Sequence, residues 1–273
     1  MTALLALWLA FILSLAMTPI VIRILKRQGH TKKNYLGLDI PTSCGISLVF
    51  SAMMAILLGY FFGWLPLSLS ELVVPLFLVS SAAFAGLVDD IWGTQSVKGF
   101  RGHLGSLIFA RRLSTGAIKA IVIFASSAIV ATAISSRLIE AVVNTFILAL
   151  SANMWNLLDL RPGRAIKAYL IVQLPVSLLT SPSSATILAF SVLGAALAYL
   201  PAELKERGML GDTGSNALGI SVGHLIVLNL GPYPKIIYLL MLLLLHLYCE
   251  KYPLSRFIER NPVLRFLDQL GRR

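Results

Sequence analysis

The sequence has few charged residues and very few cysteines for its length. Charged residues make up 13% of its 273 residues, against about 25% in a typical soluble domain, so a soluble globular fold is not expected. The two cysteines, Cys44 and Cys249, are too few for a disulfide framework and lack the spacing of a zinc site. The sequence also has no glycine-rich nucleotide fingerprint and no pattern typical of a Ser-His-Asp triad.

Hydrophobic residues dominate the remainder. They account for 57% of the chain, and the mean hydropathy is +0.83. A transmembrane helix needs about 20 predominantly apolar residues. We expect such helices at about 2–24, 44–65, 71–91, 116–135, 138–158, 166–181, 183–200, 214–230 and 233–249. The sequence therefore predicts an all-α, polytopic integral membrane protein with about 9–10 transmembrane helices, whose membrane domain spans residues 1–249.

Basic residues are distributed very unevenly between the loops. The first apolar run has none before it and is followed by Arg23, Lys26 and Arg27, the reverse of a secretory signal peptide, so we expect it to remain as a helix. Of the 23 lysines and arginines, all but Arg137 and Lys235 fall on one side of the predicted topology. The positive-inside rule makes that side cytoplasmic. The net charge of +11 then reflects loop charge and attraction to anionic lipid or a phosphorylated substrate, with no nucleic acid as partner.

The last segment, residues 250–273, is expected to form a basic amphipathic cytoplasmic tail. Its apolar residues alternate with basic ones, and Pro262 interrupts it. Two interpretations stay open at this point. The tail lies on the inner leaflet of the bilayer, or it packs as a helix on the cytoplasmic loops.

Polar residues gather where apolar runs end on the predicted cytoplasmic side, and the first group is Asp89-Asp90. Acidic residues at the edge of a membrane helix are energetically costly and are therefore functional candidates. Two adjacent carboxylates suit Mg²⁺ when substrate phosphates complete its coordination shell. The alternative is that both acids cap the loop and pair with Lys98 or Arg101.

The second group is Asn153, Asn156 and Asp159, which form a drifting polar stripe at steps of three residues. Such a stripe either coordinates a metal or polar ligand, or makes hydrogen bonds between helices. The third group, Gly211 to Ser215, opens the predicted eighth helix, whose free backbone N–H groups suit an anion. Asp212 beside a phosphate requires a bridging cation, which favours a metal ligand over a plain N-cap.

Two basic segments complete the set. Lys32-Lys33 in the first cytoplasmic loop and Lys98 after the aspartate pair supply cations for phosphate groups. The alternative is that the lysines of the first loop only determine topology.

Taken together and in this order, these motifs resemble those of the polyprenyl-phosphate N-acetylhexosamine-1-phosphate transferases. This family includes the phospho-N-acetylmuramoyl-pentapeptide transferase of bacterial cell-wall synthesis. The segment Ile40-Pro41-Thr42-Ser43-Cys44-Gly45 resembles the family's Pro-Thr-x-Gly-Gly loop, and Lys98-Gly99 resembles its Lys-Gly. The resemblance covers roughly residues 18–225.

The resemblance implies an all-helical enzyme in the bacterial inner membrane, with a cytoplasmic active site that uses Mg²⁺. Such an enzyme transfers a sugar-1-phosphate from a UDP-N-acetylhexosamine-type donor to polyprenyl (undecaprenyl) phosphate in the bilayer and releases UMP, in cell-wall or envelope glycan synthesis. A homodimer is left open. Carried over by position, the metal ligands are Asn156 and Asp212, the catalytic pair is Asp89 and Asp90, and the substrate-binding residues are Lys33, Lys98, Asn153 and Asp159.

The sequence departs from the family pattern after the asparagine stripe. The family usually reads Asp-Gly-x-Asp-Gly, whereas Asp159 is followed here by Leu160-Arg161-Pro162-Gly163-Arg164. A histidine-rich loop near the family's C-terminus is also missing, and His246 lies inside an apolar run. Two alternatives therefore remain: a catalytically degenerate homologue that binds lipid phosphate, and a secondary transporter.

Overall fold

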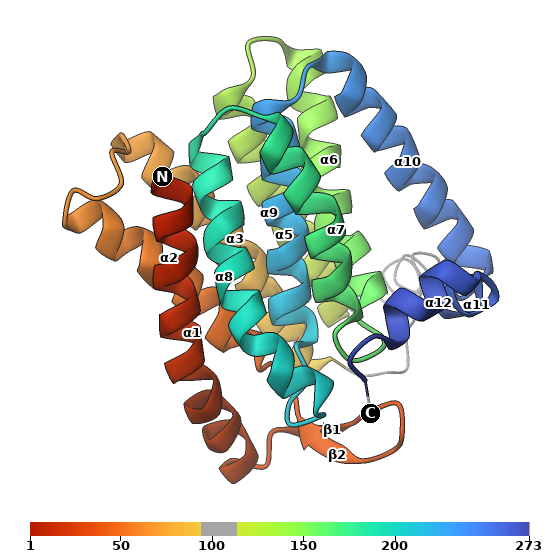
Figure 1. Cartoon of the computed structure of the whole chain (residues 1–273). Helices are drawn as coiled ribbons and strands as arrows, with labels where there is room; N and C mark the ends of the chain where they lie inside the picture. Colours follow the sequence, from red (N-terminus) through yellow and green to blue (C-terminus); the bar gives the residue numbers. More distant parts are fainter. Residues whose placement is uncertain (94–113, 273) are drawn as a thin grey trace.

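The structure, a computed structural model, describes residues 1–93 and 114–272. Of these described residues, 79% are helical, and Figure 1 shows the helices packed as a bundle. Its elements are α1 (Thr2–Arg27), β1 (Thr31–Lys33), β2 (Asp39–Pro41), α2 (Gly45–Phe61), α3 (Leu69–Trp92), α5 (Thr115–Ile134), α6 (Leu138–Leu158), α7 (Arg164–Leu179), α8 (Ser184–Leu204), α9 (Gly211–Asn229), α10 (Pro232–Lys251), α11 (Leu254–Arg260) and α12 (Pro262–Gln269).

The predicted fold class is confirmed. Each of the nine apolar segments predicted from sequence contains a helix. Within the described ranges, six helices are long and apolar enough to cross a membrane, namely α1, α3, α5, α6, α8 and α10. The shorter α2 is also apolar, and α7 and α9 complete the bundle. The protein is therefore an all-α, multi-pass membrane protein.

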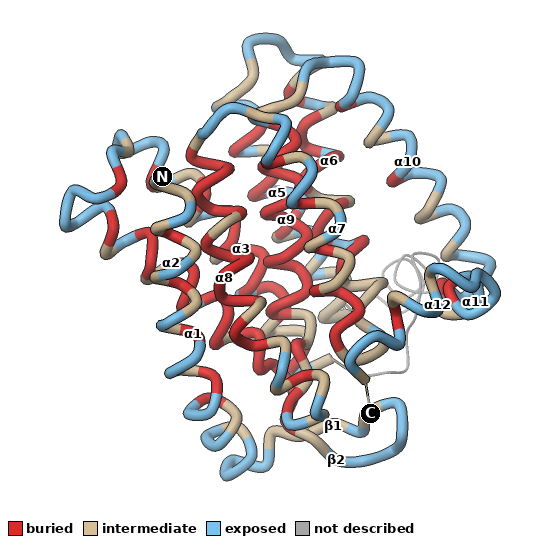
Figure 2. Tube along the Cα trace, viewed as in Figure 1, coloured by how far each residue is buried: buried red, intermediate tan, exposed pale blue. Residues whose placement is uncertain are grey.

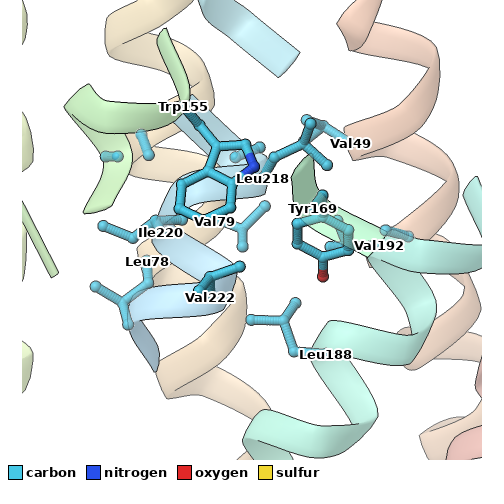
Figure 3. Packing of buried hydrophobic residues seen from close by; sticks show 14 of the residues in the cluster. Val49, Leu78, Val79, Trp155, Tyr169, Leu188, Val192, Leu218, Ile220 and Val222 are labelled. Atoms are coloured by element: carbon cyan, nitrogen blue, oxygen red, sulfur yellow. The ribbon is translucent and has the colours of Figure 1, made fainter. Parts of the chain in front are cut away.

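Helix α9 runs through the middle of the bundle. It packs against α2, α3, α6, α7 and α8, and its residues are buried from Thr213 to Val227 (Figures 1 and 2). Figure 3 shows Leu218, Ile220 and Val222 from this helix in the same apolar cluster as Trp155 of α6. Because other helices surround α9, it can carry polar residues that a lipid-facing helix would expose at high cost.

The helices alternate in direction, so that chain segments distant in sequence meet at one end of the bundle (Figure 1). The antiparallel hairpin β1–β2, which pairs Lys33 with Asp39, lies at this end together with α11 and α12. We call it the hairpin end. Lys235 and Glu140, which form an ion pair of 3.4 Å, lie near the starts of α10 and α6, at the opposite end of the bundle.

The tail beyond α10 packs on the start of α7. The guanidinium of Arg164 donates hydrogen bonds to both carboxylate oxygens of Asp268, at 2.7 and 3.0 Å. Lys167 donates to the backbone carbonyls of Asp268 and Leu270, at 2.5 and 3.1 Å. One of the two interpretations left open by the sequence was a tail packed on the cytoplasmic loops. Helix α10 ends at Lys251, so it includes the first two residues of the predicted tail 250–273.

Candidate active site

The last turn of α3 and the first turn of α9 lie in direct contact at the hairpin end. Gly86 permits this approach, because a β-carbon there would collide with the backbone carbonyl of Asp212. Gly211 begins α9 with a positive φ of 72°, which favours glycine. A β-carbon at Gly211 would also lie 2.6 Å from a carboxylate oxygen of Asp90. Two glycines thus bring the aspartates of α3 and α9 together.

Asp90 caps the start of α9. Its Oδ1 accepts a hydrogen bond from the backbone N–H of Asp212 at 3.0 Å. Its Oδ2 accepts two more, from the backbone N–H and the hydroxyl of Thr213, at 3.1 and 2.7 Å. The side chain of Asp90 is buried, and both oxygens satisfy N–H groups that a helix start leaves unpaired. Asp90 therefore holds α9 in place.

Asp89 points to a different partner, Lys119 of α5. The Nζ of Lys119 lies 2.9 Å from Oδ2 of Asp89 and also forms an ion pair with Oδ2 of Asp212. The side chains of Asp89 and Asp212 are 20% and 24% exposed, so both carboxylates remain accessible from the hairpin end. One cation thus lies between two carboxylates that come from separate helices.

Asn156 of α6 completes this cluster. In the amide orientation that satisfies both partners, its nitrogen donates to Oδ1 of Asp212 at 2.8 Å and its oxygen accepts from Nζ of Lys119 at 2.9 Å. Four side chains from four helices therefore share one hydrogen-bond network. We call Asp89, Lys119, Asn156 and Asp212 the carboxylate cluster.

Asp159 and Glu203 also lie close to the start of α9. Asp159 follows α6 directly and accepts a hydrogen bond from the backbone of Gly211. Burial raises the pKa of Asp159 well above its usual value, and the nearby carboxylate of Glu203 raises it further. Glu203 itself is buried and accepts backbone hydrogen bonds from Leu210 and Gly163. Five acidic side chains thus lie in or next to the first turn of α9, namely Asp89, Asp90, Asp159, Glu203 and Asp212.

The loop that resembles the family's Pro-Thr-x-Gly-Gly motif braces the residues just before Asp212. The backbone N–H of Met209 donates to the carbonyl of Pro41 at 2.7 Å. In return, the N–H groups of Cys44 and Gly45 donate to the carbonyls of Met209 and Leu210, at 3.0 and 2.9 Å. These paired backbone bonds explain structurally why the motif and the Asp212 segment belong together.

Two predicted substrate-binding residues that the structure describes, Asn153 and Lys33, lie outside the cluster. Asn153 is exposed on α6, one turn before Asn156. Lys33 is exposed on β1, and the hairpin contacts the bundle through Asn34 and Tyr35, which donate to Glu206 at 2.7 and 3.0 Å. Lys98 lies outside the described residues.

Sequence reasoning missed Lys119 and Glu203. Lys119 falls inside the predicted span 116–135. A lysine within an apolar run needs a buried partner, and this requirement could have identified Lys119 as a candidate site residue. Glu203 follows another apolar run in the same way, and an acid at that position carries the same cost.

The residues of the carboxylate cluster fit a magnesium site that substrate completes. Within residues 1–93 and 114–272, no three or more His, Cys, Asp or Glu side chains gather as a metal cage. Mg²⁺ is commonly held by only one or two carboxylates, with substrate phosphates and water filling the octahedral shell. Asp89 and Asp212 supply two such carboxylates beside the amide of Asn156. The ammonium of Lys119 lies between them and already shows that this position favours a cation.

The fold and this cluster define a multi-pass membrane protein with an acidic centre at one edge of its helix bundle. The model of glycosyl transferase family 4 matches residues 72–229, which is 158 of the 273 residues and includes every member of the carboxylate cluster. The chain belongs to this family, that of the polyprenyl-phosphate hexosamine-1-phosphate transferases. Its general activity is thus that of a polyprenyl-phosphate sugar-1-phosphate transferase. A search of curated proteins gives no significant match.

Proposed function

We propose that the protein transfers a sugar-1-phosphate from a UDP-N-acetylhexosamine-type donor to undecaprenyl phosphate, with release of UMP, in cell-wall or envelope glycan synthesis. The observation that carries this proposal is the carboxylate cluster, because it places two accessible acids and a lysine at the end of spanning helices. A long isoprenoid stays in lipid at such a position, while its phosphate meets a water-soluble nucleotide.

The reaction is a displacement at phosphorus. An oxygen of the lipid phosphate attacks the β-phosphorus of the UDP-sugar, the bond from that phosphorus to the bridging oxygen breaks, and UMP leaves with the electron pair. Catalysis of phosphoryl transfer rests mainly on positioning and on neutralising negative charge. When bound, Mg²⁺ supplies Lewis-acid stabilisation of the diphosphate oxygens. Asp212, Asp89 and Asn156 would hold the ion, and Lys119 would offset the phosphate charge.

The two adjacent aspartates take different roles in this proposal. Both oxygens of Asp90 already accept hydrogen bonds from the start of α9, so Asp90 positions Asp212. Asp89 faces the cluster and is the member of the pair placed to contact substrate or metal. A general base adds little here, since a phosphate monoester has a second pKa of about 6 and is largely dianionic at pH 7.

We place the hairpin end on the cytoplasmic face of a bacterial cell membrane. Among the residues that the structure describes, most lysines and arginines belong to loops and segments at that end, whereas Arg137 and Lys235 lie at the other. This distribution follows the positive-inside rule. A UDP-sugar made in the cytoplasm reaches the cluster only with this orientation.

The location of the cluster also argues against a secondary transporter. Transporter sites lie near the middle of the bilayer, where discontinuous helices meet. Here the acidic residues gather at helix ends. Uptake of substrate into proteoliposomes without formation of UMP would favour transport.

The test is an assay of the purified protein with undecaprenyl phosphate, Mg²⁺ and a panel of UDP-sugars, scored by UMP. We expect one donor to give UMP that depends on both the lipid and the metal. Asp212→Asn should abolish this release while the protein remains folded and inserted. Glu140→Gln, at the opposite end of the bundle, is the matched control and should retain activity. Absence of UMP with every donor would favour a degenerate homologue, and full activity of Asp212→Asn would remove the metal-site assignment.

A further inference from the structure

We propose that α11 and α12 lie in the surface of an anionic lipid leaflet at the hairpin end, with one apolar face of α12 inserted among the lipids. This tail lies outside residues 72–229, which the family model matches. The apolar face consists of Val263, Phe266 and Leu270. The inference does not depend on the proposed reaction.

The ion pairs of Asp268 determine which face of α12 is free. Asp268 is buried between Arg164 of α7 and Arg272 of the tail, and Arg272 also donates to the carbonyl of Pro162 at 2.9 Å. A helix turns by about 100° per residue, so Val263, Phe266 and Leu270 fall within about 60° of one another on the side opposite Asp268. They are 67%, 65% and 54% exposed. The polar side of α12 is therefore held by protein, and its apolar side is uncovered.

The position of the tail in the chain places it at the membrane surface. The spanning helix α10 ends at Lys251, and α11 begins at Leu254, so two residues separate the tail from the bilayer. The ring of Tyr248 contacts the rings of Tyr252 and Phe257, with centroids 5.3 and 5.7 Å apart. Aromatic residues gather in this way at membrane–water interfaces.

The outer surface of α10 continues into α11. Leu254 and Phe257 line an apolar groove of about 500 Å³ together with residues such as Leu240 and Leu244 of α10. Helix α10 is largely exposed within the chain, as expected for a helix that faces lipid. The lipid that surrounds α10 therefore also reaches α11.

The positive charge of the tail indicates that it contacts an anionic lipid surface. Arg256, Arg260 and Arg265 are all exposed on the same two short helices. A helix with an apolar face and flanking arginines suits anionic headgroups at the level of the acyl boundary. A second copy of the chain docked through the same face would bring like charges together, because a two-fold interface uses the same patch on both partners. Anionic lipid is the occupant that satisfies both the apolar residues and the arginines.

Tryptophan fluorescence in nanodiscs tests this proposal with the full-length chain. Phe266→Trp adds a probe on the apolar face, and Gln269→Trp adds a matched probe at an exposed position of the same helix outside that face. Each variant is compared with the unmodified protein, which corrects for its four native tryptophans. The nanodiscs contain phosphatidylglycerol or phosphatidylcholine alone, with and without brominated acyl chains.

In phosphatidylglycerol, bromine should quench the added emission at position 266 at least twofold more strongly than that at position 269. This difference should shrink in phosphatidylcholine. Equal quenching at the two positions would overturn the insertion. Emission from position 266 that is blue-shifted but not quenched by bromine would also overturn it, because it would show that protein covers the apolar face. Equal insertion in both lipids would overturn the requirement for anionic charge. Val263→Trp repeats the measurement on the same face if Phe266→Trp does not fold.

Discussion

Replacing each of the two adjacent aspartates with alanine should have very different effects on stability. Asp90 accepts three hydrogen bonds from the first turn of α9, whereas Asp89 pairs with Lys119 at a partly exposed site. Asp90→Ala is therefore a test of helix capping, and Asp89→Ala is the matched control. The two positions share the same helix, charge and neighbouring sequence.

The expected difference follows from the groups that each substitution leaves unpaired. Asp90→Ala removes the acceptor of two backbone N–H groups and of the Thr213 hydroxyl, which is buried. At about 1–3 kcal/mol for each unsatisfied buried donor, the free energy of unfolding should fall by about 4 kcal/mol. Asp89→Ala leaves Lys119 paired with Asp212, and an ion pair at a partly exposed site contributes about 0–1 kcal/mol.

Equilibrium unfolding in mixed micelles, titrated with SDS and followed by tryptophan fluorescence, measures both values. Thr213→Val, which removes one of the three bonds, should lose about 1–3 kcal/mol. Combined with Asp90→Ala, it should add little further loss, because the two residues share that bond. Equal losses for Asp90→Ala and Asp89→Ala, or a larger loss for Asp89→Ala, would refute the assignment of Asp90 as the cap of α9.

Three further predictions concern the approach of α3 to α9, the lysine of the carboxylate cluster and the ion pairs that hold Asp268 of the tail. Gly86→Ala should destabilise the protein by about 1–3 kcal/mol through overpacking and should slow UMP release, whereas Gly231→Ala, which meets open space, should be nearly neutral in both assays. Lys119→Met should lower the rate of UMP release about 100-fold, which is the typical effect of losing one electrostatic contact in an active site. The amount of protein in the membrane should not change. A variant with normal activity would contradict the role of Lys119. Burial opposes ionisation of Asp268, but hydrogen bonds from Arg164 outweigh it and lower the pKa of Asp268. Because the folded pKa is lowered, the stabilisation from ionised Asp268 is complete above the ordinary pKa of about 3.9 and is lost as the pH falls through the lowered pKa. Asp268→Asn should therefore speed amide hydrogen exchange in residues 262–270 at pH 7. Unchanged exchange would contradict the role of the Asp268 ion pairs in holding the tail.

Most of the fold could be predicted from sequence because the membrane imposes a length on each helix. Apolar runs of about 20 residues identified the helices, and the alternation of basic loops predicted which helix ends lie together. The predicted segments 166–181, 183–200 and 214–230 were the least secure because they are short, and α9, in the last of them, also contains Asn216, Ser221 and His224. Its position at the centre of the bundle explains this composition, and burial by neighbouring helices is a property of the tertiary fold that one sequence does not specify.

The candidate site could be predicted only in part. Acidic residues at the borders of apolar runs identified Asp89, Asp90 and Asp212 as candidates on one side of the membrane, and the family resemblance implied that they share a site. Two adjacent aspartates look alike in sequence, but on a helix their side chains diverge by about 100°, and this angle separates the cap from the cluster. The ion pair between Arg164 and Asp268 joins residues more than 100 positions apart, so no local pattern indicates it.

The central claim is that the carboxylate cluster supports attack by a lipid phosphate on the β-phosphorus of a nucleotide sugar. The most direct measurement uses a UDP-sugar labelled with ³²P at the β-phosphorus, together with undecaprenyl phosphate and the purified protein. We predict that the label moves into the lipid product while unlabelled UMP is released, and that Asp212→Asn prevents this transfer. Label recovered in UDP, with only the sugar on the lipid, would contradict the account, as would transfer that persists in Asp212→Asn.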